Sequence, residues 1–422
     1  MRRLYSLIFT LLLPLILLRL YFRGRKAPSY KARWRERFGL GECFNTPVIW
    51  VHAVSVGEVQ AARPLIDHLQ QAYPDYTILV TTMTPTGAER VADIKGKVQH
   101  RYVPYDTPGC IKRFLQRVKP TLLIVMETEI WPNMLHYCQQ QEIPTLLVNA
   151  RMSARSAKGY ARFSRLVKAT LANFSHIAVQ NPTDEARLIT LGANPTQTTV
   201  TGSLKFDFEP PAEITQQAST LRQQWGESRK IWIAASTHQG EDQQILDAFA
   251  QIRSHIPEAL LVLVPRHPER FNNVAELCRE RGLHLVRRSE QRPCSDDTAV
   301  FLGDSMGELM LFYAASDIAF VGGSLVPTGG HNLLEPAALG LPVLTGPHMF
   351  NFSDIHQLLL QGKASREVET PDQLVDAVVE LFQDENLSQT MAANGGKLVE
   401  ENRGALQKVL GLVGEAMKGR AQ

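Results

Sequence analysis

The segment VIWVHAVSVGEVQAARPLIDHL, residues 48 to 69, joins a strand pattern to a helix pattern with almost no loop between them. VIWVHA is rich in β-branched and aromatic residues, whereas EVQAARPLIDHL has helical periodicity. Glu58 stands where one pattern gives way to the other. It is interpreted either as an acid that stabilises the first turn of a helix or as a catalytic base at the carboxyl edge of a sheet. The segment alone leaves both interpretations open.

The same alternation of strand and helix continues along the chain and predicts an α/β fold with parallel sheets. We expect one series of strands at residues 48–53, 76–83, 98–105, 121–127, 145–150 and 176–181, and a second at 231–237, 260–267, 299–304, 318–324 and 342–346. The two series predict two Rossmann-like domains, 48–205 and 221–422, with a cleft between them. The polar segment 206–220 is interpreted as their linker.

The first 22 residues contain an uncharged run, residues 4 to 18, and are predicted to be a membrane anchor. A signal peptide and an interfacial hairpin are the alternatives. The segment 23–47 that follows is basic, which predicts that the globular part lies on the cytoplasmic side of the inner membrane, held by a single-pass anchor.

Charge is distributed unevenly along the 422 residues. Residues 1 to 39 hold ten Lys or Arg and one acid, and the remainder holds 35 bases against 41 acids. This distribution argues against a general nucleic-acid binder and favours a membrane-facing end. The five cysteines form no C-x-x-C pair, which indicates reduced thiols. No D-x-D triplet is present, and we expect neither a metal nor a cofactor.

The stretch GGSLVPTGGHNLLEPAALGLP, residues 322 to 342, predicts an anion site. Paired glycines allow backbone N–H groups to approach a phosphate, and Glu335 lies where it can accept the hydroxyls of a ribose. Two tight turns and a capped helix are the structural alternative. In PRHPERF, Arg266 and His267 follow a strand and offer donors to phosphate. A structural ion pair of Arg266 with Glu269 or Glu308 is the other interpretation.

The segment RMSARSAKGYARFSRLVK, residues 151 to 168, has six bases and no acid. Their spacing of three or four predicts one basic helical face that contacts anionic lipid or phosphate, although a solvated face remains the alternative. The bases concerned are Arg151, Arg155, Lys158, Arg162 and Arg165.

Ten motifs in this order resemble the 3-deoxy-D-manno-octulosonic acid (Kdo) transferase family: HAVSVGE, TTMTPTG, PYD, METEIWPN, NARMSARS, QN, TGSLKFD, PRHPERF, GDSMGELM and FVGGSLVPTGGHNLLEP. The resemblance covers nearly the whole chain. It implies a GT-B fold and an inverting, metal-independent glycosyltransferase that uses CMP-Kdo as donor and the 6′-hydroxyl of a tetra-acylated lipid A precursor as acceptor. Whether a second Kdo is added stays open.

The resemblance also implies roles for individual residues. Glu58 is expected to be the general base, and Glu127 and Lys205 to steady the transition state, with Glu129 as an alternative to Glu127. The donor nucleotide is expected to contact Arg266, His267, Met306, Gly307, Glu308, Asn332, Leu333, Leu334 and Glu335. Because Glu58 is next to a helix start, we expect a lowered pKa. The rival functions are a UDP-sugar transferase or a nucleotide-sugar epimerase on the same fold, and a membrane-attached sensor without turnover.

Overall fold

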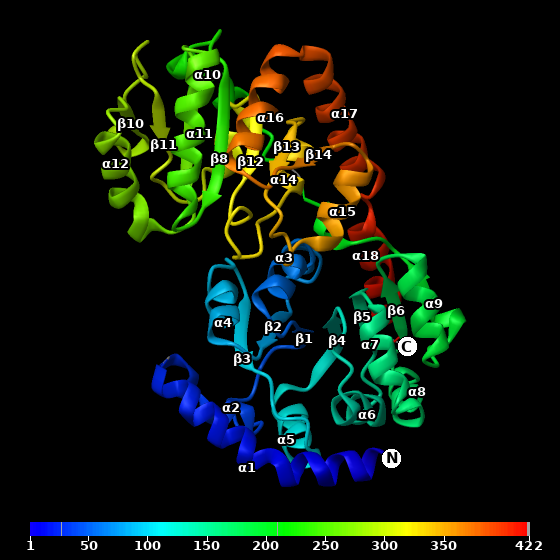
Figure 1. Cartoon of the computed structure of the whole chain (residues 1–422). Helices are drawn as coiled ribbons and strands as arrows, with labels where there is room; N and C mark the ends of the chain where they lie inside the picture. The colour runs from blue at the N-terminus through cyan, green and yellow to red at the C-terminus, as the bar shows by residue number, and fades with distance from the viewer. Residues whose placement is uncertain (27, 209, 420–422) are drawn as a thin grey trace. The chain divides into compact units, whose positions relative to one another are not determined.

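The structure is a computed structural model that describes residues 1–26, 28–208 and 210–419. The chain forms two compact units, unit 1 from residues 1–208 and 402–422, and unit 2 from residues 209–401. Each unit contains one seven-stranded parallel sheet with helices packed on both faces (Figure 1). The fold is therefore the α/β type with two Rossmann-like parts that the sequence predicts.

The sheet of unit 1 has the strand order β3-β2-β1-β4-β5-β6-β7. Strands β1, β2, β4 and β5 are buried along their whole lengths, apart from Thr121, because helices cover both of their faces. The strands are β1 (Val48–His52), β2 (Thr77–Thr82), β3 (Val98–Tyr102), β4 (Pro120–Met126), β5 (Thr145–Ala150), β6 (His176–Val179) and β7 (Thr198–Val200).

Alternate side chains of the unit 1 sheet enter two separate cores. Trp50 and Val125 pack with α5, α6, α8 and α9 on one face, whereas Val51 and Ile124 pack with α3, α4 and α18 on the other. The helices of unit 1 are α1 (Arg2–Lys26), η1 (Pro28–Lys31), α2 (Trp34–Arg37), α3 (Val56–Ala72), α4 (Pro85–Ala92), α5 (Pro108–Val118), α6 (Pro132–Gln140), α7 (Ala154–Ala161), α8 (Ser164–Leu171), α9 (Pro182–Thr190), η2 (Pro195–Gln197), η3 (Leu204–Phe206) and α18 (Ala405–Lys418).

The sheet of unit 2 has the order β10-β11-β9-β8-β12-β13-β14 and is built in the same way. Its strands are β8 (Ile231–Thr237), β9 (Leu260–Pro265), β10 (Leu285–Arg287), β11 (Val300–Leu302), β12 (Ile318–Val321), β13 (Val343–Thr345) and β14 (Ser365–Glu367). Its helices are α10 (Ile214–Trp225), α11 (Glu241–His255), η4 (Pro268–Arg270), α12 (Phe271–Glu280), η5 (Arg288–Glu290), α13 (Leu309–Ala314), α14 (Leu334–Ala338), α15 (Ser353–Gln361), α16 (Pro371–Gln383) and α17 (Glu385–Glu401).

All eleven strands expected from the sequence are present, and three more, β7, β10 and β14, were not predicted. These three lie at sheet edges and are only partly buried, so they lack the continuous burial of the equally short β11 and β13. Each sheet has a point where the strand order reverses, between β1 and β4 in unit 1 and between β8 and β12 in unit 2. Ligands of open α/β sheets bind at such points, beside the carboxyl ends of the strands.

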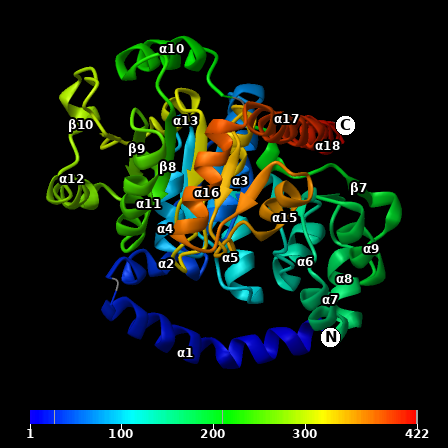
Figure 2. The ribbon, with the colours of Figure 1, turned by 45° about the horizontal axis from the view of Figure 1, so that its top comes forward.

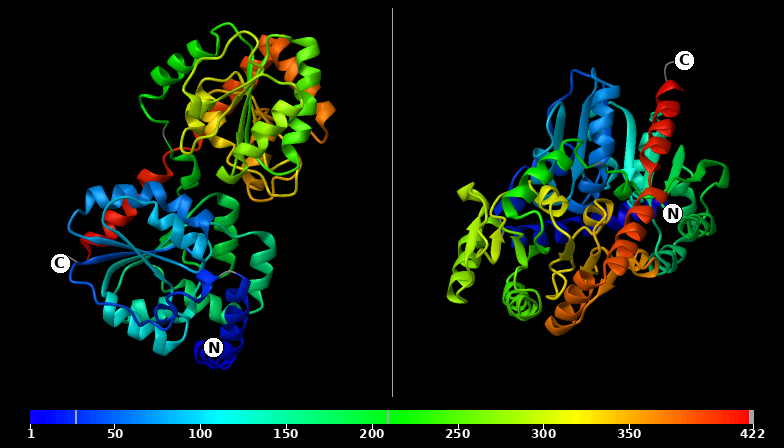
Figure 3. Two further views of the ribbon diagram at one scale, coloured as in Figure 1. Left: turned by 90° about the vertical axis from the view of Figure 1, so that its left-hand side faces the viewer. Right: turned by 90° about the horizontal axis from the view of Figure 1, so that it is seen from above.

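The carboxyl-terminal helix belongs to unit 1, whereas the sequence interpretation placed all of 221–422 in one domain. Ala405, Leu406 and Val409 of α18 are buried in the unit 1 core. Asp207 accepts hydrogen bonds from the backbone N–H of Gly404 and Leu406, at 2.6 and 2.7 Å, and so holds the start of the helix. The red helix can be followed beside unit 1 in Figure 3. Helix α10 also begins inside the segment expected to be a linker.

Helix α1 is long and apolar enough to cross a membrane by length and composition. It lies along unit 1, where it contacts α6 and η1 (Figure 2).

Candidate functional site

Glu58 lies at the carboxyl end of β1, at the reversal point of the unit 1 sheet, in the first turn of α3. Its carboxylate accepts hydrogen bonds from the backbone N–H of Val54 at 2.8 Å and from Ser55 Oγ at 3.0 Å. Ser55 is the N-cap and accepts from the Glu58 N–H. The interpretation as a helix start is thus confirmed, and it places the same carboxylate at the sheet edge.

The pKa of Glu58 is raised to about 8, so the expectation of a lowered pKa was wrong. Burial is the largest cause, since only 7% of the residue is exposed, and the neighbouring negative charge of Glu129 adds to it. Hydrogen bonds from Val54 and Ser55 lower the pKa. The charge of Glu127 raises it, by less than that of Glu129. The position at a helix terminus favours a lower pKa, but burial and the two neighbouring acids outweigh it.

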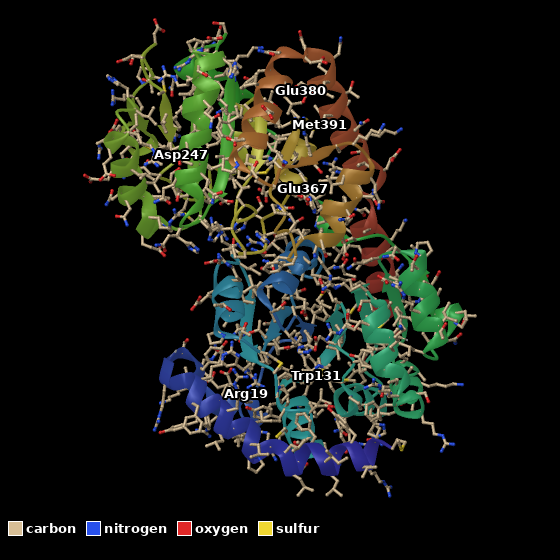
Figure 4. The ribbon with its side chains drawn as sticks, viewed as in Figure 1. Arg19, Trp131, Asp247, Glu367, Glu380 and Met391 are labelled. Carbon is tan, nitrogen blue, oxygen red and sulfur yellow. The ribbon has the colours of Figure 1, made fainter. Side chains whose placement is uncertain are left out.

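Glu127 and Glu129 follow β4, the strand on the other side of the reversal point. Glu127 forms an ion pair with Arg151, with 3.1 Å between Oε2 and Nε. Glu129 accepts a hydrogen bond from Trp131 Nε1 at 2.6 Å, and burial raises its pKa. Figure 4 labels Trp131 within unit 1. Three carboxylates from two adjacent strand ends therefore lie at one edge of the sheet. Among them, Glu127 is paired with the positive charge of Arg151.

The backbone is strained at this edge. Glu127 has a φ of 53° and Asn149, at the end of β5, a φ of 56°. Left-handed backbone is unfavourable for residues with a side chain, and such strain gathers at functional sites. Asn149 was not predicted as a site residue. Its Oδ1 accepts from the backbone N–H of Leu204 at 3.1 Å, which holds the short helix η3 that carries Lys205. Helix η3 contacts α3, the helix of Glu58.

In unit 2, a buried carboxylate that the sequence interpretation missed organises the glycine-rich loop. Glu241 is 0% exposed and accepts four backbone N–H groups, those of Gly323 at 2.7 Å, Ser324 at 3.1 Å, Leu325 at 3.0 Å and His238 at 3.1 Å. The acid stands in the HQGED sequence that follows β8, and the loop follows β12. Glu241 thus joins the two strand ends on either side of the reversal point.

Three imidazoles gather beside this loop. The rings of His238 and His331 are stacked at 5.1 Å, with their Nε2 atoms 2.9 Å apart, and the ring of His267 meets His238 edge-on at 5.4 Å. Burial and the charge of Arg266 lower the pKa of His331 to about 3, so this pair is neutral at pH 7. Arg266 follows β9 and donates its backbone N–H to the Thr237 carbonyl. The loop therefore lies beside the neutral His238–His331 pair and the cation of Arg266.

The remaining predicted nucleotide contacts fall into two groups. Asn332 Nδ2 donates to Glu335 Oε1 at 3.0 Å, and burial raises the pKa of Glu335. The side chains of Leu333 and Leu334 are fully buried, so only their backbone can meet a ligand. In the other group, Met306 is 60% exposed, Gly307 has a φ of 86°, and Glu308 forms a two-pronged ion pair with Arg288.

The basic segment does not form the single helical face that its spacing predicts. Helix α7 ends at Ala161 and α8 begins at Ser164, so Arg162 lies at the break between them. Arg151 precedes α7 and pairs with Glu127. Arg155, Lys158 and Arg165 are exposed. The prediction of one face was wrong because a periodic pattern does not reveal where a helix breaks.

No group of three or more His, Cys, Asp or Glu side chains is placed to hold a metal ion in the part of the chain that the structure describes.

Comparison with known proteins finds two family models along the chain. Residues 32–208 match the model for 3-deoxy-D-manno-octulosonic-acid transferase (kdotransferase), and residues 233–398 match glycosyl transferases group 1. The 3-deoxy-D-manno-octulosonic acid transferase of Haemophilus influenzae is 44% identical over 97% of both chains. That of Bordetella pertussis is 36% identical over 97% of this chain and 98% of its own.

Among solved structures, the UDP-GlcNAc 2-epimerase from Neisseria meningitidis bound to UDP-GlcNAc aligns with 86% of this chain and 100% of its own, with a TM-score of 0.54 and 14% identity. At that identity the likeness concerns the two-domain fold alone.

Proposed function

The chain belongs to the 3-deoxy-D-manno-octulosonic acid (Kdo) transferase family and is a glycosyltransferase, and from this premise we propose its substrates and the roles of its two sites. Unit 2 binds CMP-Kdo as the donor. The edge of unit 1 receives the 6′-hydroxyl of a tetra-acylated disaccharide lipid A precursor. The reaction inverts the anomeric centre and uses Glu58 as the base. The observation that carries this proposal is the buried carboxylate of Glu58 at the reversal point of the unit 1 sheet, with a pKa raised to about 8.

In the proposed reaction, the acceptor oxygen forms a bond to the anomeric carbon of Kdo. The bond from that carbon to the phosphate oxygen of CMP breaks, and CMP leaves with the electron pair. Glu58 takes the proton of the acceptor hydroxyl. A base with a pKa of about 8 binds that proton more firmly than an ordinary carboxylate, while still being partly ionised at neutral pH.

Charge around the reacting atoms suits an anionic substrate. Kdo carries its own carboxylate and CMP leaves as an anion, so Lys205 supplies a cation to the transition state. Glu127 supports the transition state together with Lys205, and its ion pair with Arg151 fixes both side chains at the strand end. The pair also holds the Arg151 guanidinium beside the acceptor. Arg155, Lys158 and Arg162 extend this positive surface toward the phosphates of the lipid acceptor.

On the donor side, the Arg266 guanidinium is the group that suits a phosphate. Because Glu241 already accepts the N–H groups of Gly323, Ser324 and Leu325, it acts as a positioning residue for this loop. Glu335, which accepts a hydrogen bond from Asn332, is proposed to accept the hydroxyls of the ribose, and Asn332 to donate to it. The segment from Met306 to Glu308 is proposed to surround the base.

Replacing Arg266 with alanine is expected to weaken CMP binding by about 10–100-fold, because a charge-assisted hydrogen bond to phosphate contributes about 1.5–3 kcal/mol. Isothermal titration calorimetry with CMP measures the change. The matched control is Arg279→Ala on the exposed side of α12, which should leave the Kd unchanged. Equal affinities for the two variants would exclude Arg266 from the donor site.

The activity should rise with pH as Glu58 loses its proton. With a pKa of about 8, only about a tenth of the side chain is ionised at pH 7, so kcat/KM should rise about tenfold between pH 6 and 7 and level off above about pH 9. A pH profile of transfer measures this. The residual activity of Glu58→Gln should lack the step, and a flat wild-type profile from pH 6 to 8 would contradict the assignment.

Mass spectrometry of the products tests donor, acceptor and number of transfers together. The full chain is incubated with CMP-Kdo and tetra-acylated lipid A precursor, and a mass increase of one Kdo, or of two, is expected. UDP-linked sugars offered in parallel should give no product. Calorimetry that finds tighter binding of UDP than of CMP would instead favour the UDP-sugar function.

We also place the protein at the cytoplasmic face of the inner membrane, held there by α1. A lipid acceptor resides in a membrane, and α1 has the apolar length that an anchor needs.

A further inference from the structure

Helix α1 is apolar on all sides, but its two faces differ in what covers them. One set of side chains recurs every three or four residues and is 50% to 69% exposed: Leu4, Leu7, Leu11, Leu15, Leu18 and Phe22. We name these six residues the anchor stripe. The residues on the opposite side, such as Ser6, Phe9 and Ile16, are buried or half-buried. An exposed apolar stripe of this length indicates an interaction surface.

The first turns of α1 are hydrogen-bonded to the body of unit 1. Asn133 is 0% exposed, and its Oδ1 accepts from Arg2 Nη1 at 2.8 Å and from Ser6 Oγ at 2.9 Å. Its Nδ2 donates to the backbone carbonyl of Asp106 at 2.6 Å. Pulling this end of the helix away would leave the buried Oδ1 of Asn133 without these two donors, which is costly.

The chain that follows α1 is also joined to the body of unit 1. The guanidinium of Arg23 lies 4.5 Å from the ring of Tyr30 in η1. Just beyond, Glu36 accepts from the backbone N–H of Tyr102 at 2.8 Å, and the buried Arg37 donates to the carbonyl of Met83 at 3.0 Å. Both Tyr102 and Met83 belong to the body, at the ends of β3 and β2.

Attachment of the first turns of α1, and of the chain just after the helix, conflicts with a single crossing. A helix of 25 residues is about 37 Å long and could span the ~30 Å core of a bilayer. A span would put its two ends on opposite sides. The first turns are nevertheless bound to the α/β body, Ile16 lines a cavity with body residues, and the chain rejoins that body at Glu36 and Arg37. The polar loops of this body cannot lie in lipid. We propose that α1 lies in the plane of an anionic phospholipid bilayer, with the anchor stripe in lipid and both of its ends on the cytoplasmic side.

The exposed arginines of α1 favour an anionic bilayer over a second copy of the chain as the surface that covers the anchor stripe. Arg3, Arg19, Arg23 and Arg25 are exposed on α1, and long basic side chains beside an apolar stripe reach the phosphates of anionic lipids. Figure 4 labels Arg19 on the helix. The body-facing side of α1 lines a cavity of about 360 Å³ together with Glu129, Trp131 and Tyr160. An in-plane helix therefore keeps the carboxylate edge of unit 1 beside the lipid surface.

Cysteine labelling of the full chain tests the arrangement. The background carries Cys43→Ser and Cys294→Ser, because these are the two cysteines that are not buried. Arg3→Cys, Leu11→Cys and Arg25→Cys are introduced one at a time, all at exposed positions of α1. Spheroplasts that produce each variant are treated with a membrane-impermeant maleimide–polyethylene glycol before and after permeabilisation.

We expect Arg3→Cys and Arg25→Cys to react only after permeabilisation, and Leu11→Cys to react at least about tenfold more slowly than either. Reaction of Arg3→Cys in intact spheroplasts would overturn the proposal, since the helix would then cross. Equal reaction of Leu11→Cys and Arg3→Cys after permeabilisation would overturn it as well, because the stripe would be in water. Transfer activity is assayed separately in detergent, so failure here is distinguishable from failure of the proposed reaction.

Discussion

Glu58→Gln should lower the rate of Kdo transfer by about 10²–10⁴-fold while the protein stays folded. Glutamine keeps an oxygen that can accept from the Val54 N–H, so the start of α3 is preserved, but it cannot take the acceptor proton. The change also removes a group that is costly to ionise in its buried position. Initial rates with CMP-Kdo and the lipid A precursor, together with thermal unfolding, measure the two effects.

The matched control is Asp67→Asn on the same helix, which removes an exposed carboxylate paired with Arg63 and should leave the rate unchanged. A Glu58→Gln rate close to that of the wild type would end the assignment of the base. Glu127→Gln provides a second comparison. If its loss were the larger, the roles of the two carboxylates would be exchanged.

Glu241→Ala is expected to have the largest effect on stability. Four backbone N–H groups would lose their acceptor in a place that water does not reach. Buried donors left unsatisfied cost about 1–3 kcal/mol each before relaxation, so a loss of about 3–5 kcal/mol in the free energy of unfolding is expected. Differential scanning calorimetry should show unit 2 melting about 10 °C lower.

The same variant should lose CMP affinity, because the glycine-rich loop would no longer be held at the ends of β8 and β12. Asp247→Ala is the control. It lies on the same helix, is 63% exposed and is paired only across the surface with Arg281. Its melting temperature should stay within about 2 °C of the wild type. A Glu241→Ala protein as stable as this control would show that the loop does not depend on the carboxylate.

Local sequence patterns predicted the elements of the fold well where those elements are long and buried. Strand β1 and helix α3 were located almost to the residue, because a β-branched run and a 3.6-residue period are both properties of neighbours in the chain. The same local signal failed at Arg162, where one helix ends and another begins, and at β7, whose three residues show no period.

Residues of the candidate site could be predicted only where they stand at the end of a strand. Parallel strands place their carboxyl ends at one edge, so Glu58 and Glu127 were expected there from order alone. Glu241 was missed because nothing in HQGED reveals that its side chain turns inward to meet a loop more than eighty residues later. Asn149 was missed for the same reason, since its partner Leu204 lies in a different segment.

The α/β class, the two parallel sheets and the edge at which Glu58 stands were predictable from the amino-acid sequence, because they follow from periodicity and from the order of the strands. The pKa of Glu58, the return of α18 to unit 1 and the attachment of α1 along the body became known from the folded structure. Each of these depends on burial or on contacts between segments distant in the chain. Such contacts arise only once the chain has folded, and no local pattern records them.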